Sequence, residues 1–191
     1  INYFEFFYNT KNSDVDFDLK ESSRPDYDID LRTRLVARNA PFLSACNQSD
    51  LMISPTDFQK STAPIEYQGK IKVVHDGIDT NTIVSNPNAS ITLKSESNIK
   101  NKKIFTKKDK VIAFVNRNLE PYRGYHSFMR SLPAVLKKHP DAYVLIVGGS
   151  GVSYGASPKG DTSFKDIFYN EVKDKLPKNN KVIFLGFIKY N

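Results

Sequence analysis

The sequence predicts an α/β protein with parallel β-sheets flanked by helices. Short apolar runs rich in β-branched and aromatic residues alternate along the chain with longer stretches of helical spacing. This alternation is typical of βαβ units, in which a helix joins two parallel strands. The chain has 191 residues, of which 39% are hydrophobic, so it can form one large domain or parts of two around a buried core.

The first half of the chain holds three strand patterns and two helix patterns. The longer helix contains Pro41, which should bend or restart it. A shorter helix is expected after Ser54, a favourable N-cap, because Pro55 suits the first helical position and Asp57 places acid in the first turn. The strands are predicted at 3–8, 51–53 and 70–74, and the longer helix at 31–48.

An acidic stretch after the first strand raises the question of a metal site. Residues 14–18 alternate aspartate with apolar residues. An EF-hand loop starting there would need glycine where Leu19 stands and glutamate where Pro25 stands. An Asp-x-Asp metal site would want an apolar strand to follow, and none does. We therefore expect an exposed acidic loop over residues 9–30 and no metal.

The expected cellular location follows from the absence of membrane-spanning and signal-peptide patterns in the sequence. No apolar run is long enough to span a membrane, and the N-terminus has no signal-peptide pattern. Cys46 is the only cysteine, so an internal disulfide is impossible, and its apolar helical setting predicts a buried thiol. We expect a cytoplasmic protein, with peripheral contact at the inner face of the membrane as an alternative.

Residues 80–110 are rich in Asn, Ser, Thr, Pro and Lys, and we expect a crossing between two domains that carries a loosely structured or hairpin insertion. The net charge of +7 suggests an acidic partner: nucleic acid, anionic lipid or a phosphorylated small molecule. The lysines of this segment form a charge run, and such runs are most often exposed, solvated faces, which indicates a solvated loop. Because no stacking platform or recognisable motif accompanies them, we expect no nucleic-acid binding. The lysines are Lys100, Lys102, Lys103, Lys107, Lys108 and Lys110.

The second half repeats the strand and helix alternation. Its first helix contains Pro133, which should kink it, and ends near His139 with basic residues in the last turn. The strands are predicted at 111–115, 142–147 and 181–185, and the helices at 125–138 and 163–176. A doubly wound sheet normally continues beyond three strands, so this domain is predicted to be incomplete.

A basic loop between the first strand and first helix of this half is the best candidate for a functional site. Arg117 and Arg123 lie on either side of Glu120. A helix N-terminus offers unpaired N–H groups and a positive dipole end, and arginine offers forked donors that match phosphoryl oxygens. The alternative is a pair of surface salt bridges to Glu120, which would contribute only about 0–1 kcal/mol. The residues favour anion binding.

Three other features were weighed as sites. Residues 148–151 lack the spacing and position of a dinucleotide fingerprint, so Gly149 belongs either to a tight turn or to a ligand-facing loop. His75 ends a strand, where it could face a cleft or serve a polar turn. His126, at a helix start, could pack or contact a ligand. No serine or cysteine pattern suggests a catalytic triad.

Several motifs agree in order with those of one known family along nearly the whole chain. They are Phe4-Glu5-Phe6-Phe7-Tyr8, Arg38-Asn39-Ala40-Pro41, Ser54-Pro55-Thr56, Val74-His75-Asp76-Gly77-Ile78-Asp79, Arg117-Asn118-Leu119-Glu120-Pro121-Tyr122-Arg123-Gly124, Leu145-Ile146-Val147-Gly148-Gly149 and Phe184-Leu185-Gly186-Phe187-Ile188. The Arg-to-Gly loop and the Gly-Ile-Asp crossing are the most specific of them. In these motifs the sequence resembles the retaining glycosyltransferases of family four, which have the GT-B fold.

The resemblance implies two Rossmann-like domains and a nucleotide-diphosphate sugar as donor, bound without a metal or other cofactor. Arg117 matches the arginine that stabilises the leaving diphosphate, and Arg123 stands where lysine is commoner. The main chain near Gly186 and Ile188 would lie against the nucleobase. Glu120, His75 and Gly149 are further candidates for substrate contact. The acceptor could be a glycan, a lipid or a small molecule.

Some features of the family are missing. A Glu-x7-Glu motif that grips the donor sugar is expected after Ile188, and a glycine-rich loop and acceptor residues are expected before Ile1. We therefore expect the middle of a glycosyltransferase, inactive or nearly so alone. Residues 1–79 would end the acceptor-side domain, 80–110 would cross, and 111–191 would begin the donor-binding domain. The alternative function is a noncatalytic nucleotide- or phosphate-binding module.

Overall fold

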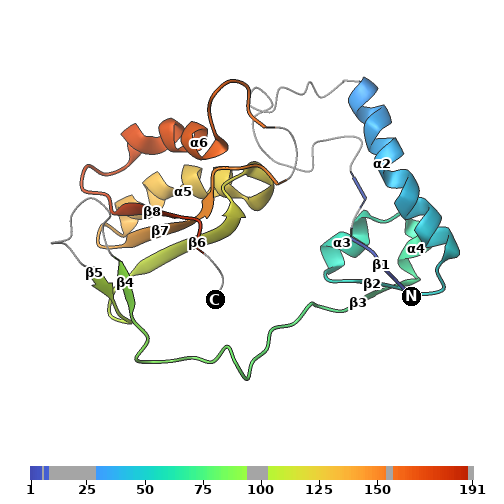
Figure 1. Ribbon diagram of the computed structural model, residues 1–191, viewed down its shortest axis with the longest axis horizontal. Coiled ribbons are helices and arrows are strands. Elements are labelled where there is room, and N and C mark those ends of the chain that lie inside the picture. Colours follow the sequence, from blue (N-terminus) through green and yellow to red (C-terminus); the bar gives the residue numbers. More distant parts are fainter. Residues whose placement is uncertain (6, 9–28, 94–102, 154–156, 189–191) are drawn as a thin grey trace. The chain divides into compact units, whose positions relative to one another are not determined.

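The computed structural model describes residues 1–5, 7–8, 29–93, 103–153 and 157–188 (Figure 1). It divides into two compact units: unit 1, Ile1–Ile83, and unit 2, Val84–Asn191. Most of the predicted acidic loop at 9–30 lies outside the described residues, as do Lys100 and Lys102 of the lysine run, whereas Ile29 and Asp30 are helical and begin a helix instead of ending a loop. The predicted domain boundaries at 79 and 110 stay predictions.

Unit 1 is built on a three-stranded parallel sheet. Its strands are β1 (Asn2–Tyr3), β2 (Met52–Ser54) and β3 (Ile71–Val73), in the order β1-β2-β3. The helices are α2 (Ile29–Gln48), α3 (Asp57–Thr62) and α4 (Ile65–Gln68). Aromatic and aliphatic side chains form the core with Cys46, which is buried as predicted; the buried cluster is Phe4, Phe7, Cys46, Met52, Ala63 and Ile71.

Two local predictions in unit 1 need correction. Of the two effects expected of Pro41, the restart does not occur: α2 continues through the proline, with Cys46 beyond it buried in the core, while the expected bend stays a prediction. The N-cap of α3 is Thr56, not Ser54: its hydroxyl accepts the Gln59 N–H at 3.1 Å. Ser54 cannot start the helix because it is still a β2 residue, paired with Val73 in the sheet.

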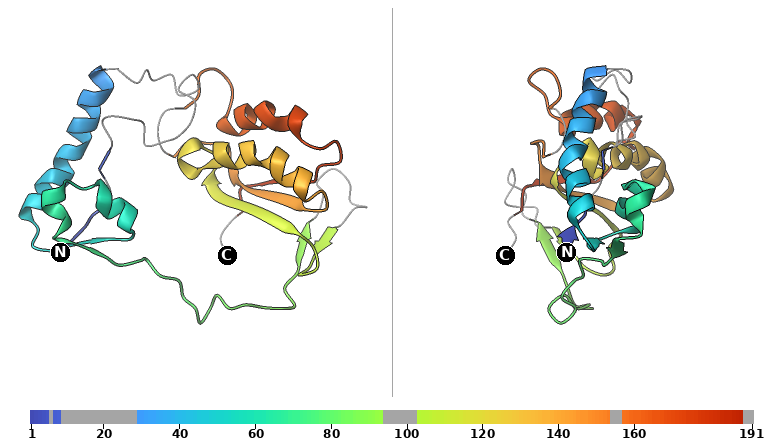
Figure 2. Two further views of the ribbon diagram at one scale, coloured as in Figure 1. Left: turned by 180° about the vertical axis from the view of Figure 1, so that it is seen from behind. Right: turned by 90° about the vertical axis from the view of Figure 1, so that its right-hand side faces the viewer.

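Unit 2 contains a second parallel sheet with helices on one face. Its strands are β6 (Val111–Asn118), β7 (Tyr143–Gly149) and β8 (Val182–Gly186), in the order β6-β7-β8. Helix α5 (Tyr125–Lys138) joins the first two strands and α6 (Phe164–Val172) joins the last two, and Figure 2 shows both helices on the same side of the sheet. The predicted α/β class with parallel sheets and flanking helices is confirmed.

Short elements complete unit 2. The 3-10 helices η1 (Pro121–Arg123) and η2 (Lys173–Lys175) lie before α5 and after α6. An antiparallel pair, β4 (Ile91–Leu93) and β5 (Lys103–Phe105), precedes the parallel sheet. Phe105 of this pair packs edge-on against Tyr143 at the start of β7, with the ring centroids 4.8 Å apart.

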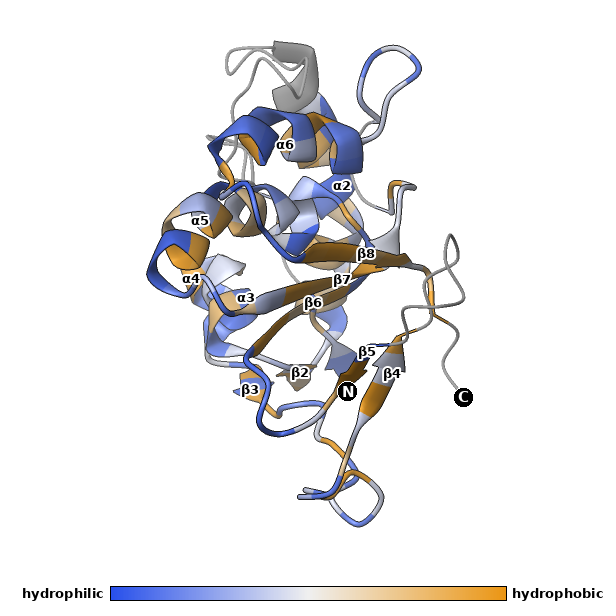
Figure 3. Cartoon of the chain, turned by 90° about the vertical axis from the view of Figure 1, so that its left-hand side faces the viewer, coloured by the Kyte–Doolittle hydropathy of each residue, from blue (hydrophilic) through white to orange (hydrophobic). Residues whose placement is uncertain are grey.

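The core of unit 2 lies between the sheet and its two helices. Figure 3 shows hydrophobic colour along much of β6, β7 and β8, whereas α5 and α6 carry both hydrophilic and hydrophobic residues. Tyr125 and Phe168 are fully buried and meet edge-on. Arg130 of α5 joins Glu171 of α6 through two bonds of 2.8 and 2.9 Å. Burial of one apolar stripe per helix is the main source of helix stability in such a layer.

Strand β6 is longer than predicted. It includes Asn116, Arg117 and Asn118, which the sequence analysis placed in a loop. The pairing with β7 shifts register between Val115 and Asn118 and ends with Asn118 opposite Gly149. A charged residue is compatible with the end of this strand because the Arg117 side chain is exposed to solvent. Arg117 therefore belongs to the end of strand β6, within the register shift between Val115 and Asn118.

Candidate anion site at the carboxyl edge of the second sheet

Two segments meet where β6 and β7 end. We call residues 117–124 the arginine loop and residues 148–153 the glycine loop. The Leu119 N–H donates to the Gly149 carbonyl at 2.9 Å, and the Asn118 side-chain amide donates to Ser153 Oγ at 2.7 Å. The carboxyl ends of parallel strands share one edge of the sheet, which is where open α/β sheets bind ligands.

The glycines allow the two loops to approach this closely. A Cβ on Gly148 would lie 2.9 Å from the Asn116 carbonyl oxygen, and the residue has a φ of +156°. A Cβ on Gly149 would lie 2.9 Å from Asn118 Oδ1. A larger residue at Gly148 would clash with backbone, whereas one at Gly149 would displace the Asn118 side chain. Gly149 ends β7 and lies in close contact with Asn118, and its predicted role beside a ligand stays a prediction.

Glu120 belongs to the arginine loop, has no exposed surface, and extends its side chain to the glycine loop. Its Oε2 accepts the Ser153 backbone N–H at 2.7 Å, and its Oε1 lies 3.8 Å from Nε of Arg123. A buried carboxylate without such partners would be strongly destabilising, so both contacts offset the cost of its desolvation. The sequence suggested the ion pair as an alternative. The bond to Ser153 shows in addition that Glu120 bridges the two loops.

The two arginines have different surroundings. Arg123 belongs to η1, its side chain is about one-third exposed, and it faces Glu120. Arg117 is exposed at the end of β6, and the described part of the chain offers it no hydrogen bond or ion pair. The salt-bridge alternative is therefore present for Arg123, in a buried form, whereas Arg117 remains available to an anion.

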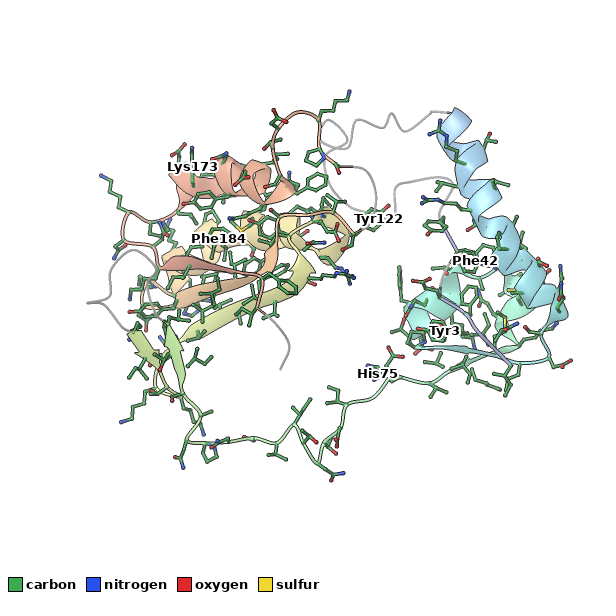
Figure 4. All side chains as sticks on the ribbon, viewed as in Figure 1. Tyr3, Phe42, His75, Tyr122, Lys173 and Phe184 are labelled. Atoms are coloured by element: carbon green, nitrogen blue, oxygen red, sulfur yellow. The ribbon has the colours of Figure 1, made fainter. Side chains whose placement is uncertain are left out.

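Helix α5 adds the positive end of its dipole to this edge. The turn into it is made by Gly124, which has a φ of +74° and precedes Tyr125. No side chain caps the helix start, and its first turn contains no acidic residue. Uncapped N–H groups beside arginine make a favourable environment for a phosphate or other anion. Figure 4 shows Tyr122 of η1 at this end of the unit, far from Lys173 of η2.

The two candidate histidines make local contacts, and their predicted roles beside a ligand stay predictions. His126 is 4% exposed, and its ring lies 5.8 Å from that of Phe168, so it packs at the start of α5. His75, in unit 1, is exposed, and its Nδ1 accepts the Gly77 N–H at 3.0 Å (Figure 4). That bond fits the polar-turn role, with Gly77 at a φ of +79°. It also places the proton of the neutral ring on Nε2.

The end of β8 lies at the same sheet edge as the two loops. Gly186 pairs opposite Val147 of β7 and has a φ of +66°. Ile188 is 56% exposed and Phe187 is 67% exposed. Large apolar side chains this open to solvent could contact the flat face of a ligand, and backbone after Gly186 is accessible beside them.

Within the described residues, no group of three or more His, Cys, Asp or Glu side chains is placed to hold a metal ion. A search of that same part of the chain for a helix long and apolar enough to cross a membrane finds none.

Two comparisons with known proteins find similarity to glycosyltransferases. Residues 1–83 match the family described as "Glycosyl transferase family 4 group". The chain is also 30% identical over 117 residues to the "Putative glycosyltransferase YtcC" of Bacillus subtilis (strain 168), a match that covers 61% of this chain and 26% of that protein. The chain thus spans about a quarter of that relative's length and is similar to family 4 glycosyltransferases.

Proposed function

We propose that this chain is part of a glycosyltransferase that takes a sugar from a nucleotide-diphosphate donor, and that unit 2 holds the diphosphate. The observation that carries the proposal is the exposed Arg117 at the carboxyl edge of a parallel sheet, beside the uncapped start of α5. The match of residues 1–83 to a glycosyltransferase family supports the reaction class. The identity of the acceptor is left open.

The chemistry needs positive charge where the leaving group forms. When the bond between the anomeric carbon and the diphosphate oxygen breaks, negative charge grows on that oxygen. Arg117 and the start of α5 would stabilise this charge, and Arg123 would add a second cation that Glu120 holds in place. Donors preorganised for charge that develops in the transition state are usually the largest source of rate enhancement. In this proposal the cations do the work without a metal.

The finer features follow from the same site. The accessible main chain of Gly186 and Ile188 would lie against the nucleobase, and the glycine loop would border the phosphates. Transfer would proceed with retention at the anomeric carbon. A noncatalytic nucleotide-binding module would use the same arginine and helix start, so binding alone does not separate the two readings, whereas sugar transfer by the whole protein does.

The proposal is tested by titrating nucleoside diphosphates calorimetrically into the chain at two salt concentrations. Arg117→Ala should weaken binding at least tenfold, since a charge-assisted contact contributes about 1.5–3 kcal/mol. Lys173→Ala is the matched control, because it removes the same charge from η2 at the other end of the unit. An equal loss of affinity in both variants would show that binding depends on the total positive charge of the unit and not on a specific site.

Single-stranded DNA is titrated under the same conditions. We expect weak, steeply salt-dependent binding that Arg117→Ala leaves unchanged, as for any basic surface. Tight DNA binding together with absent nucleotide binding would contradict the proposed function.

A further inference from the structure

We propose that Glu120 is a positioning residue that joins the arginine loop and the glycine loop into a single anion cradle. The inference rests on the proposed function, since it concerns how the same site is organised. Glu120 is fully buried, and its two oxygens point to different loops: Oε2 to the Ser153 N–H at 2.7 Å and Oε1 to Arg123 at 3.8 Å.

Only a carboxylate can satisfy both contacts at once. It has two acceptor oxygens, whereas the isosteric amide of glutamine has one acceptor and one donor end. In Glu120→Gln, one end can accept from Ser153, but the other then presents N–H groups to the Arg123 guanidinium. The reverse orientation pairs Arg123 and opposes the Ser153 N–H. In either orientation, the glutamine side chain loses its favourable contact with Ser153 or with Arg123.

Other contacts set the loops in the same register. Asn118 donates to Ser153 Oγ at 2.7 Å, and the backbone bond from Leu119 to Gly149 closes the other side. Gly148 has no space for a side chain at the meeting point. These contacts bring the glycine loop against β6, and none of them involves the Arg123 guanidinium. Glu120 contacts both Arg123 and the glycine loop.

The positioning role makes a prediction that is opposite in sign to simple electrostatics. Removing a negative charge from beside an anion site should strengthen anion binding if charge alone matters. If Glu120 orients Arg123 and the glycine loop, its loss should weaken binding because the freed groups must be ordered again when the anion binds. The sign of the change in affinity therefore separates positioning from a merely electrostatic or structural role.

The test uses the whole chain and uridine diphosphate as the probe. Glu120→Gln should weaken its affinity about tenfold, which is about 1.4 kcal/mol. Glu171→Gln is the matched control, because it neutralises the carboxylate of the Arg130 pair between α5 and α6. The control should change the affinity less than twofold. Unchanged or tighter binding by Glu120→Gln would overturn the proposal.

A second measurement needs no ligand, and a second variant is available if Glu120→Gln fails to fold. Hydrogen exchange of the Ser153 backbone amide and of the Arg123 Nε–H is followed by NMR in the wild type and in Glu120→Gln. At least one of the two must lose protection; no change in either would also overturn the proposal. If Glu120→Gln does not fold, Asn118→Ala replaces it. It loosens the same two loops without altering a buried charge, and should weaken binding about threefold; an unchanged affinity would count against the cradle.

Failure of the proposed function has a different signature. If the wild-type chain binds no nucleoside diphosphate or inorganic pyrophosphate, the anion site is refuted and the positioning role falls with it, whatever the exchange data show. If the wild type binds and Glu120→Gln binds equally well, only the positioning role is refuted.

Discussion

At the scale of single residues, the most restrictive positions are the glycines between the two loops. Gly148→Ala should destabilise unit 2 by about 2 kcal/mol, because the new Cβ would meet a backbone oxygen at 2.9 Å in a left-handed conformation. Gly151→Ala is the control in the same loop: its Cβ would lie 3.4 Å from Asn118 Oδ1, an ordinary contact. Urea unfolding of both variants measures the difference. Equal stability would show that the loops separate at little cost.

The buried Tyr125 makes a prediction about pH. Burial raises the pKa of its hydroxyl, which donates to the Lys165 carbonyl at 3.1 Å. A raised pKa in the folded state means that this group's contribution is complete below its ordinary pKa of 10.0 and is lost as the pH rises above that value. The stability of unit 2 should therefore fall above about pH 10.

Tyr125→Phe tests that expectation. At neutral pH it should cost about 1 kcal/mol, from one buried hydrogen bond. Above pH 10 the stability of the variant should decline less steeply than that of the wild type, because phenylalanine has no hydroxyl group that could lose a proton. Thermal unfolding across this pH range provides the comparison, and parallel curves for the two proteins would exclude Tyr125 as a source of the alkaline loss.

At the scale of elements, the forked ion pair between α5 and α6 should help to set their packing. Arg130 bonds Glu171 through two nitrogens and lies 5.3 Å over the Phe168 ring. Arg130→Lys keeps the charge but loses the fork and the flat contact, so we expect a loss of about 1 kcal/mol. A double-mutant cycle with Glu171→Gln isolates the pair. A coupling near zero would assign the packing of α5 and α6 to apolar contacts alone.

The elements also show what the sequence can and cannot predict. Apolar runs and helical spacing placed β7, β8 and α5 within a residue or two, because periodic burial leaves a periodic pattern. The N-cap was misplaced because Ser54 and Thr56 are both good caps, and only sheet pairing shows that Ser54 is still in a strand. Arg117 was placed in a loop because an exposed strand end looks like one.

The candidate site was predicted in part for a related reason. Basic residues before a helix N-terminus are a local signal, so Arg117 and Arg123 could be found from sequence. The contact of Glu120 with Ser153 joins residues that are 33 positions apart, and no local pattern reports it. The sequence does indicate one part of this arrangement, because a carboxylate between two arginines can form an ion pair with one of them.

At the scale of the whole molecule, the account assigns nucleotide binding to unit 2. Among its described residues, this unit has a buried core of twelve side chains, distinct from the buried cluster of unit 1. Residues 84–191 expressed alone should therefore fold and bind a nucleoside diphosphate within about threefold of the whole chain's affinity. Calorimetry on both proteins makes the comparison. A folded unit 2 that binds no nucleotide would show that unit 1 supplies part of the site.

The central claim is that a nucleoside diphosphate binds at the carboxyl edge of the second sheet. Backbone NMR of the whole chain, with uridine diphosphate added stepwise, tests it most directly. The account predicts that the largest amide shifts fall at Arg117, at the start of α5, in the glycine loop and at Gly186–Ile188. Shifts confined to the lysines at 103–110, or scattered over both units without saturation, would contradict it.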